Sequence, residues 1–140
     1  MAAAPRQRQQ VTRAPQRVLI HWTGEAARSA TLAISASVLR HVPAEAVYLG
    51  IVPGDAASPA HPHGMRELLD ARSEAQRAHG LEMRTELHFG DGERQLARRL
   101  AEAPGQMLIL GVTDLADFTQ RFRRLLEGAC PVLIVHRGAS

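Results

Sequence analysis

Short apolar runs alternate along the chain with longer segments in which apolar residues recur every three or four positions. The runs are rich in Val, Ile and Leu, which is typical of strands, whereas the wider spacing is typical of helices that bury one face. The runs predict strands at 17–22, 46–52, 81–89, 106–112 and 131–136. The spaced segments predict helices at 25–41, 65–80, 90–103 and 117–129, with a proline-rich loop at 53–64.

The repeated order of strand and helix predicts one α/β domain with a parallel sheet. Strands that run parallel need crossovers, and right-handed crossovers place helices on both faces of the sheet. The run at 106–112 is apolar throughout, as expected of a central strand, whereas 81–89 has polar positions and is expected at an edge. Ligands of such sheets bind at the carboxyl ends of the strands, so we expect any site at the turns 22–24, 52–64 and 111–117.

The charge is unevenly distributed. The chain has 17 basic and 14 acidic residues, and a formal net charge of +3. Four arginines and no acid lie in residues 1–17, which leaves 13 basic and 14 acidic residues in the remainder. A nearly neutral body does not favour a nucleic-acid-binding face, so we expect no nucleic-acid partner. We interpret 1–16 as a disordered basic extension and 17–140 as the folded domain.

The sequence offers little to support a metal, redox or membrane protein. Cys130 is the only cysteine, which excludes an internal disulfide, and its apolar neighbours predict a buried side chain. His61 and His63 lack a third nearby ligand, so we expect no metal site. No apolar run reaches the ~18 residues of a membrane span, and residues 1–17 lack the apolar core of a secretory signal. We therefore expect a cytoplasmic protein without membrane insertion.

Several polar and aromatic residues near the expected turns are candidates for a site. His21 and Trp22 end the first strand and could stack on a flat ligand, although a Trp there more often fills the pocket mouth. Asp114 and Asp117 could act as acid and base, but without a nucleophile they are better explained as caps of the next helix.

A cluster of arginines in the fourth helix has two interpretations. Arg121, Arg123 and Arg124 could bind an anion or a partner, and a solvated helix face is the simpler alternative. The chain has no P-loop, no G-x-S-x-G motif, no His–Glu metal helix and no Cys–His pair. We therefore expect no catalytic residue and no enzyme activity.

Three stretches, taken in order, resemble the universal stress protein family. They are "VLIHWTGEAARSA" at 18–30, "HFGDGERQLARRLAEAPGQMLILG" at 88–111 and "CPVLIV" at 130–135. The match covers residues 17–136. The resemblance implies an open five-stranded parallel sheet in the order 3-2-1-4-5. It also implies homodimers that form by antiparallel pairing of the last strand.

The family contains ATP binders and non-binders, and the binders are expected to carry G-x2-G-x9-G-[ST] after the fourth strand. Aligned from Gly111, the chain has Asp114, Arg124 and Leu125 at the three later positions. A phosphate cradle needs glycines for close backbone approach, and carboxylates in the turn would repel a triphosphate. Binders are also expected to have an Asp at the turn after the first strand, where this chain has Trp22 and Thr23. The resemblance therefore implies that the phosphate loop is missing.

We expect a non-enzymatic, dimeric regulatory module of the stress response that binds no ATP and no other cofactor. Two alternatives stay open. One is an adenine-nucleotide sensor with a divergent pocket at the carboxyl ends of the first, second and fourth strands, and the other is an adaptor that docks on a transporter or kinase. The candidate contacts of a bound ligand are Trp22, Thr23, Val52, Gly111 and Arg121. The expected dimer interface is Val132, Leu133, Ile134 and Val135.

Overall fold

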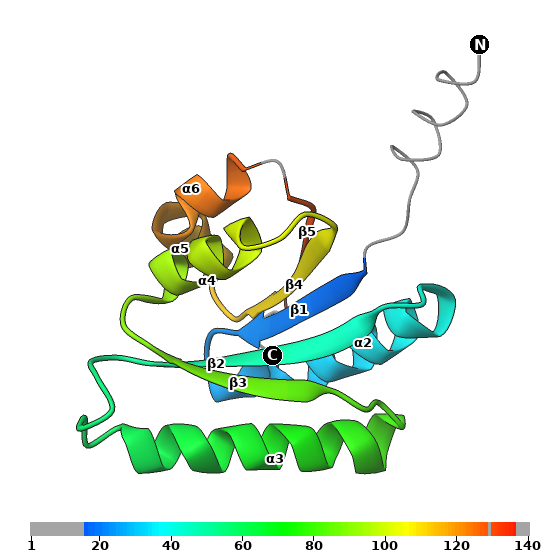
Figure 1. The fold of residues 1–140 in the computed structure, drawn as a ribbon, viewed down its shortest axis with the longest axis horizontal. Helices are drawn as coiled ribbons and strands as arrows, with labels where there is room; N and C mark the ends of the chain where they lie inside the picture. Colours follow the sequence, from blue (N-terminus) through cyan, green and yellow to red (C-terminus); the bar gives the residue numbers. More distant parts are fainter. Residues whose placement is uncertain (1–15, 129, 137–140) are drawn as a thin grey trace.

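The computed structural model describes residues 16–128 and 130–136 (Figure 1). The predicted extension lies outside the described residues except for Gln16. The strands are β1 (Arg17–Trp22), β2 (Glu45–Val52), β3 (Arg84–Phe89), β4 (Gln106–Val112) and β5 (Val132–His136). The helices are the 3₁₀ turn η1 (Glu25–Ala27), α2 (Arg28–His41), α3 (His61–His79), α4 (Gly92–Ala101), α5 (Leu115–Arg121) and α6 (Arg123–Leu126).

The five strands form one parallel sheet in the order β3-β2-β1-β4-β5, which confirms the predicted fold. β1 lies at the centre, with Ile20 opposite Tyr48 of β2 and Trp22 opposite Gly111 of β4. In Figure 1, α2 and α3 lie on one side of the sheet and α4, α5 and α6 on the other. This arrangement places the carboxyl ends of β1 and β2 beside the first turn of α3.

Each face of the sheet has its own core. Side chains alternate along a strand, so Val18, Ile20 and Trp22 of β1 join the cluster under α2 and α3. Leu19 points the other way and packs with Leu96, Phe118 and other residues of α4, α5 and α6. The central strands are buried on both faces, as their continuous apolar runs predict.

The start of α3 differs from the prediction. The segment 53–64 was expected to be a loop because of its prolines, but the helix begins at His61 rather than at residue 65. Pro62 is accommodated in the first turn, where the backbone has no helical hydrogen bond to lose. The predicted end is confirmed, because Gly80 takes the left-handed conformation that closes the helix.

Two other predicted boundaries are also wrong. Strand β3 begins at Arg84 rather than at residue 81, and the buried Leu81 and Met83 precede it. The single helix expected at 117–129 is two short helices that meet at Phe122, whose φ of −111° departs from helical geometry. The predicted bounds of β1 and β4 are confirmed, and the remaining boundaries differ from the predicted ones by at most two residues, apart from the 3₁₀ turn ahead of α2.

Candidate functional site

A pocket of about 240 Å³ lies at the carboxyl ends of β1 and β2, and we call it the β1–β2 pocket. Its position is the one that parallel sheets use for ligands. Its walls come from the strand ends, the following loop and the first two turns of α3. The residues that matter below are His21, Trp22, Tyr48, Val52, His63 and Glu67.

The floor of this pocket is an aromatic stack. The rings of Trp22 and Tyr48 lie nearly parallel, with centroids 4.4 Å apart and an interplanar angle of 19°. The indole Nε1–H of Trp22 donates to Oε1 of Glu67 at 3.3 Å, so its one polar atom has a partner. Burial, followed by the charge of Glu67, raises the pKa of Tyr48 and keeps its hydroxyl protonated. The protein's own side chains therefore occupy the surface on which a flat ligand would stack.

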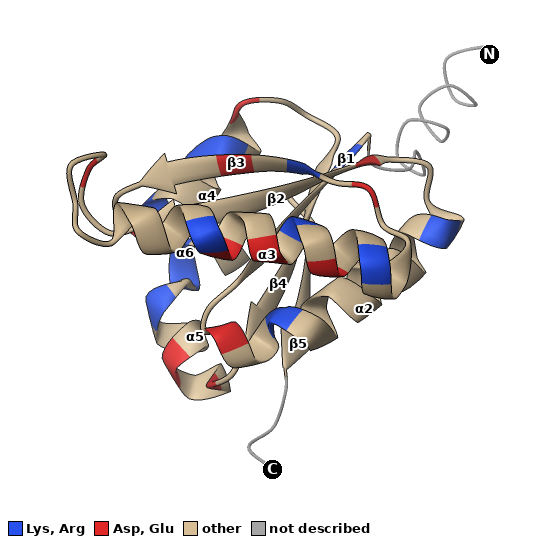
Figure 2. Cartoon of the chain, turned by 90° about the horizontal axis from the view of Figure 1, so that it is seen from below, with Lys and Arg blue, Asp and Glu red and all other residues tan. Residues whose placement is uncertain are grey.

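An arginine fixes α3 over this stack. Nη1 of Arg28 donates to both carboxylate oxygens of Glu67 at 3.2 and 3.1 Å, and its Nε donates to Glu74 at 3.0 Å. Burial lowers the pKa of Arg28, but the two carboxylates more than offset that effect and the pKa is raised. Figure 2 shows that basic and acidic residues are interspersed along α3. The ion pairs join the start of α2 to α3 and place one positive charge among the carboxylates next to the pocket.

His21 precedes Trp22 in β1, and its side chain is buried on the opposite face of the sheet. Its Nδ1–H donates to the backbone oxygen of Leu49 at 2.7 Å. Burial is the largest cause that lowers the pKa of His21, to about 4, and the positive charge of Arg121 acts in the same direction. The imidazole is therefore neutral at physiological pH, and it ties the end of β1 to β2.

The five predicted ligand contacts do not all line one pocket. Trp22 and Val52 line the β1–β2 pocket. Thr23 directs both its backbone N–H and its hydroxyl at the carbonyl oxygen of Gly111, at 2.9 and 3.4 Å. Arg121 is exposed on α5, where it pairs with Asp117 at 3.3 Å.

Gly111 has a packing role at its position in β4. A Cβ atom there would overlap the hydroxyl oxygen of Thr31, a buried residue of α2. The missing side chain lets α2 approach the sheet closely. The first glycine of the phosphate motif therefore has a local explanation that involves no phosphate.

The turn after β4 is short and acidic. Only Thr113 and Asp114 separate β4 from α5, and the Asp114 side chain accepts a hydrogen bond from the backbone N–H of Asp117 at 3.0 Å. The predicted capping role of Asp114 is confirmed. The last two motif positions fall inside α6, where Arg124 is exposed and Leu125 is buried in the core.

Sequence reasoning pointed to Trp22 but missed its partners. Tyr48, Glu67 and Arg28 come from three different elements and reach Trp22 only when these pack together. Glu67 and Glu74 are seven positions apart on α3, and this spacing on one helix face was the only available signal.

The described residues hold no cluster suited to a metal ion. His61 packs edge-on against Phe89, with ring centroids 5.3 Å apart, and His63 lines the β1–β2 pocket. Within residues 16–128 and 130–136, no group of three or more His, Cys, Asp or Glu side chains is placed to hold a metal. None of the helices in the same residues is long and apolar enough to cross a membrane.

Strand β5 lies at the edge of the sheet, and among the described residues it pairs only with β4. Leu133 has 36% of its surface exposed, and Val132, Ile134 and Val135 are half-buried. The free backbone groups and apolar side chains of β5 thus form one surface. This is the surface that the predicted dimer would use.

Comparison with known proteins shows the fold. No family model and no curated protein matches the chain. A solved structure from the universal stress protein family of Burkholderia pseudomallei is 19% identical, with a TM-score of 0.63 over 86% of this chain and 95% of that one. The universal stress protein from Archaeoglobus fulgidus in complex with dAMP is 15% identical, with a TM-score of 0.65 over 86% and 97%. A universal stress protein in complex with cAMP is 16% identical, with a TM-score of 0.63 over 88% and 98%. The chain therefore has the fold of universal stress proteins.

Proposed function

We propose that this chain is a non-enzymatic regulatory module of the universal stress protein type that does not bind ATP. The observation that carries the proposal is the Trp22–Tyr48 stack, in which the two rings cover each other at the floor of the β1–β2 pocket and Trp22 is held by Glu67. The acidic turn at Asp114 supports it, because that carboxylate is already used as a helix cap. These two features work against a preformed binding position for the base and for the phosphates of a nucleotide.

The size of the pocket supports the same proposal. Small-molecule pockets usually measure about 300–1,000 Å³, and the β1–β2 pocket has about 240 Å³. To admit a nucleobase, Trp22 would have to leave Tyr48 and break its hydrogen bond to Glu67. An aromatic pair contributes about 0.5–1.5 kcal/mol beyond its buried area. Separating Trp22 from Tyr48 would therefore cost free energy and weaken nucleotide binding.

An adenine-nucleotide sensor remains the second candidate function. The structures with dAMP and cAMP are the observation that favours it, because their proteins share this fold. In that case Trp22 would swing out of the pocket and stack on the base. The adaptor alternative would be tested by capturing transporters or kinases on the immobilised protein.

Calorimetric titration separates the first two functions. We expect no binding of ATP with magnesium, dAMP or cAMP to the wild-type chain. A micromolar Kd for any of them would refute the proposal. Trp22→Ala serves as the diagnostic variant: if nucleotide binds only after this change, the filled pocket is what excludes it.

We also propose that the module forms a homodimer through β5. An unpaired edge of Val132, Leu133, Ile134 and Val135 is a pairing hazard that charge, proline or cover normally prevents. Antiparallel pairing with a second copy across a two-fold axis would satisfy the free backbone groups and cover Leu133.

The dimer is tested by sedimentation at micromolar concentration. Leu133→Lys charges the edge at a side chain that is already 36% exposed, and it should give a folded monomer. Ile34→Lys is the matched control, because Ile34 is a helix residue of α2 with 41% of its surface exposed. A monomeric wild-type chain, or a Leu133→Lys chain that stays dimeric, would contradict this interface.

A further inference from the structure

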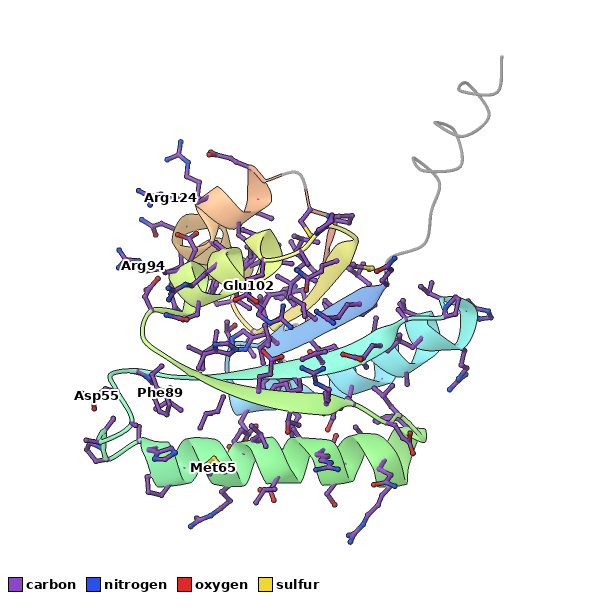
Figure 3. The ribbon with its side chains drawn as sticks, viewed as in Figure 1. Asp55, Met65, Phe89, Arg94, Glu102 and Arg124 are labelled. Carbon is purple, nitrogen blue, oxygen red and sulfur yellow. The ribbon has the colours of Figure 1, made fainter. Side chains whose placement is uncertain are left out.

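A larger hollow lies at the opposite end of the sheet from the β1–β2 pocket. It has about 760 Å³ and runs between the last turns of α4 and the end of α6, above the start of β4. We call it the α4–α6 groove. Figure 3 shows Glu102, just after α4, and Arg124 on α6, the two helices that flank it.

The walls of the groove are mainly apolar. They include Ala97, Leu100 and Ala101 of α4, Leu125 of α6, and Met107 and Pro131 beneath. This apolar surface is the part of the groove that a ligand would cover.

The polar groups in its floor already have partners. The amide of Gln106 donates to the carbonyl oxygens of Arg99, Leu100 and Ala103 at 3.0, 3.2 and 3.1 Å, and its oxygen accepts from Arg99. The thiol of Cys130 donates to the backbone oxygen of Gln106 at 2.8 Å. A ligand in the groove therefore meets an apolar floor whose polar atoms are not available to it.

Arg124 is the exception on the rim. Its backbone N–H donates to Glu93 at 3.3 Å, but within the described part of the chain its guanidinium has neither an ion pair nor a hydrogen bond. The neighbouring Arg121 and Arg123 pair with Asp117 and Glu127. One unpaired cation thus lines a groove that is otherwise apolar.

We propose that the α4–α6 groove binds a small molecule with an apolar body and one carboxylate. The apolar part would lie against Leu100, Ala101 and Leu125, and the carboxylate would pair with Arg124. The volume falls within the range of about 300–1,000 Å³ that is usual for small-molecule sites. A partner helix fits less well, because α6 has four residues and is about 6 Å long, whereas anchors at i and i+7 span about 10 Å.

The α4–α6 groove is separate from the β1–β2 pocket that the proposed function concerns. Binding to the groove is tested with octanoate on the full-length wild-type chain. Cys130 is the only cysteine and lines the groove, so protection from a thiol reagent reports occupancy. We expect octanoate to slow the labelling of Cys130 and to bind with a measurable Kd by calorimetry. 1-Octanol, which lacks the charge, should bind more weakly.

Three variants decide the proposal. Arg124→Gln should weaken octanoate binding about tenfold or more and leave 1-octanol unchanged, because a charged hydrogen bond is lost. Arg123→Gln, on the same helix but paired with Glu127, is the matched control and should bind like wild type. Ala101→Phe adds a ring from an exposed helix position and should block binding, with an unchanged melting temperature as the check on folding. Equal affinity of wild type and Arg124→Gln for octanoate, or binding by Ala101→Phe, would overturn the proposal.

Discussion

Acidification should weaken the fold through His21, at pH values where most carboxylates are still ionised. The buried imidazole has a pKa of about 4, below the ordinary 6.5, because the fold removes it from water. Between these two pH values the unfolded chain binds a proton that the folded chain does not. The free energy of unfolding therefore falls as the pH drops through 6.5, and the loss stops growing below about 4.

The size of the effect follows from the two pKa values. Each pH unit below 6.5 lowers the free energy of unfolding by about 1.4 kcal/mol. The loss is therefore about 2 kcal/mol at pH ~5 and about 3 kcal/mol once the pH reaches the pKa of His21 in the folded protein. Glu86 does not interfere in this window. Its hydrogen bonds from Arg99 are the main cause that lowers its pKa to about 2, and the stability it contributes is lost only below its ordinary value of 4.5.

Urea unfolding at pH ~7.5 and pH ~5 measures this loss, with denaturant slopes compared at both pH values. His21→Asn is the control, because its side-chain amide can still donate to Leu49 but does not titrate in this range. The variant should lose about 2 kcal/mol less than wild type on acidification. Equal losses in the two proteins would refute the assignment to His21, whatever the total loss.

Three further predictions concern the pocket, the packing of α2 and the extension. Trp22→Ala should destabilise the protein by about 3–5 kcal/mol in urea unfolding, and added indole should restore part of the loss by filling the cavity; no rescue would mean that the pocket collapses. Gly111→Ala should lower the free energy of unfolding by about 1–3 kcal/mol, and adding Thr31→Ala to that variant should recover part of the loss. A Gly111→Ala protein as stable as wild type would contradict the close packing of α2. Deletion of residues 1–15 should leave the melting temperature within about two degrees, because they offer little apolar surface; Gln16 is kept because its N–H donates to Gly105 at 2.8 Å.

The pattern of apolar residues by itself predicted the elements and the sheet. Runs such as 106–112 are apolar throughout because a central parallel strand is covered on both faces. Such a strand can therefore be recognised from its own residues alone. The polar positions of β3 likewise indicated an edge, which is where the strand lies. The resemblance to universal stress proteins added the strand order, and the structure confirms it.

Local signals were weaker where two preferences competed. The prolines of 53–64 predicted a loop, but a proline in the first helical turn loses no hydrogen bond, so α3 begins at His61. The spacing of Phe118 and Phe122 predicted one helix, but the structure contains two, which meet at Phe122 while both rings pack into the same core cluster.

The candidate site was decided by the tertiary structure. Trp22 could be identified as a residue at a strand end, but whether it receives a ligand or fills the pocket depends on Tyr48, Glu67 and Arg28. These residues belong to β2, α3 and α2, and no local pattern relates them. They meet because β1 pairs with β2 and α3 crosses back over both. The buried indole N–H of Trp22 takes its partner from α3 because that helix lies within reach, and the folded chain alone determines which element that is.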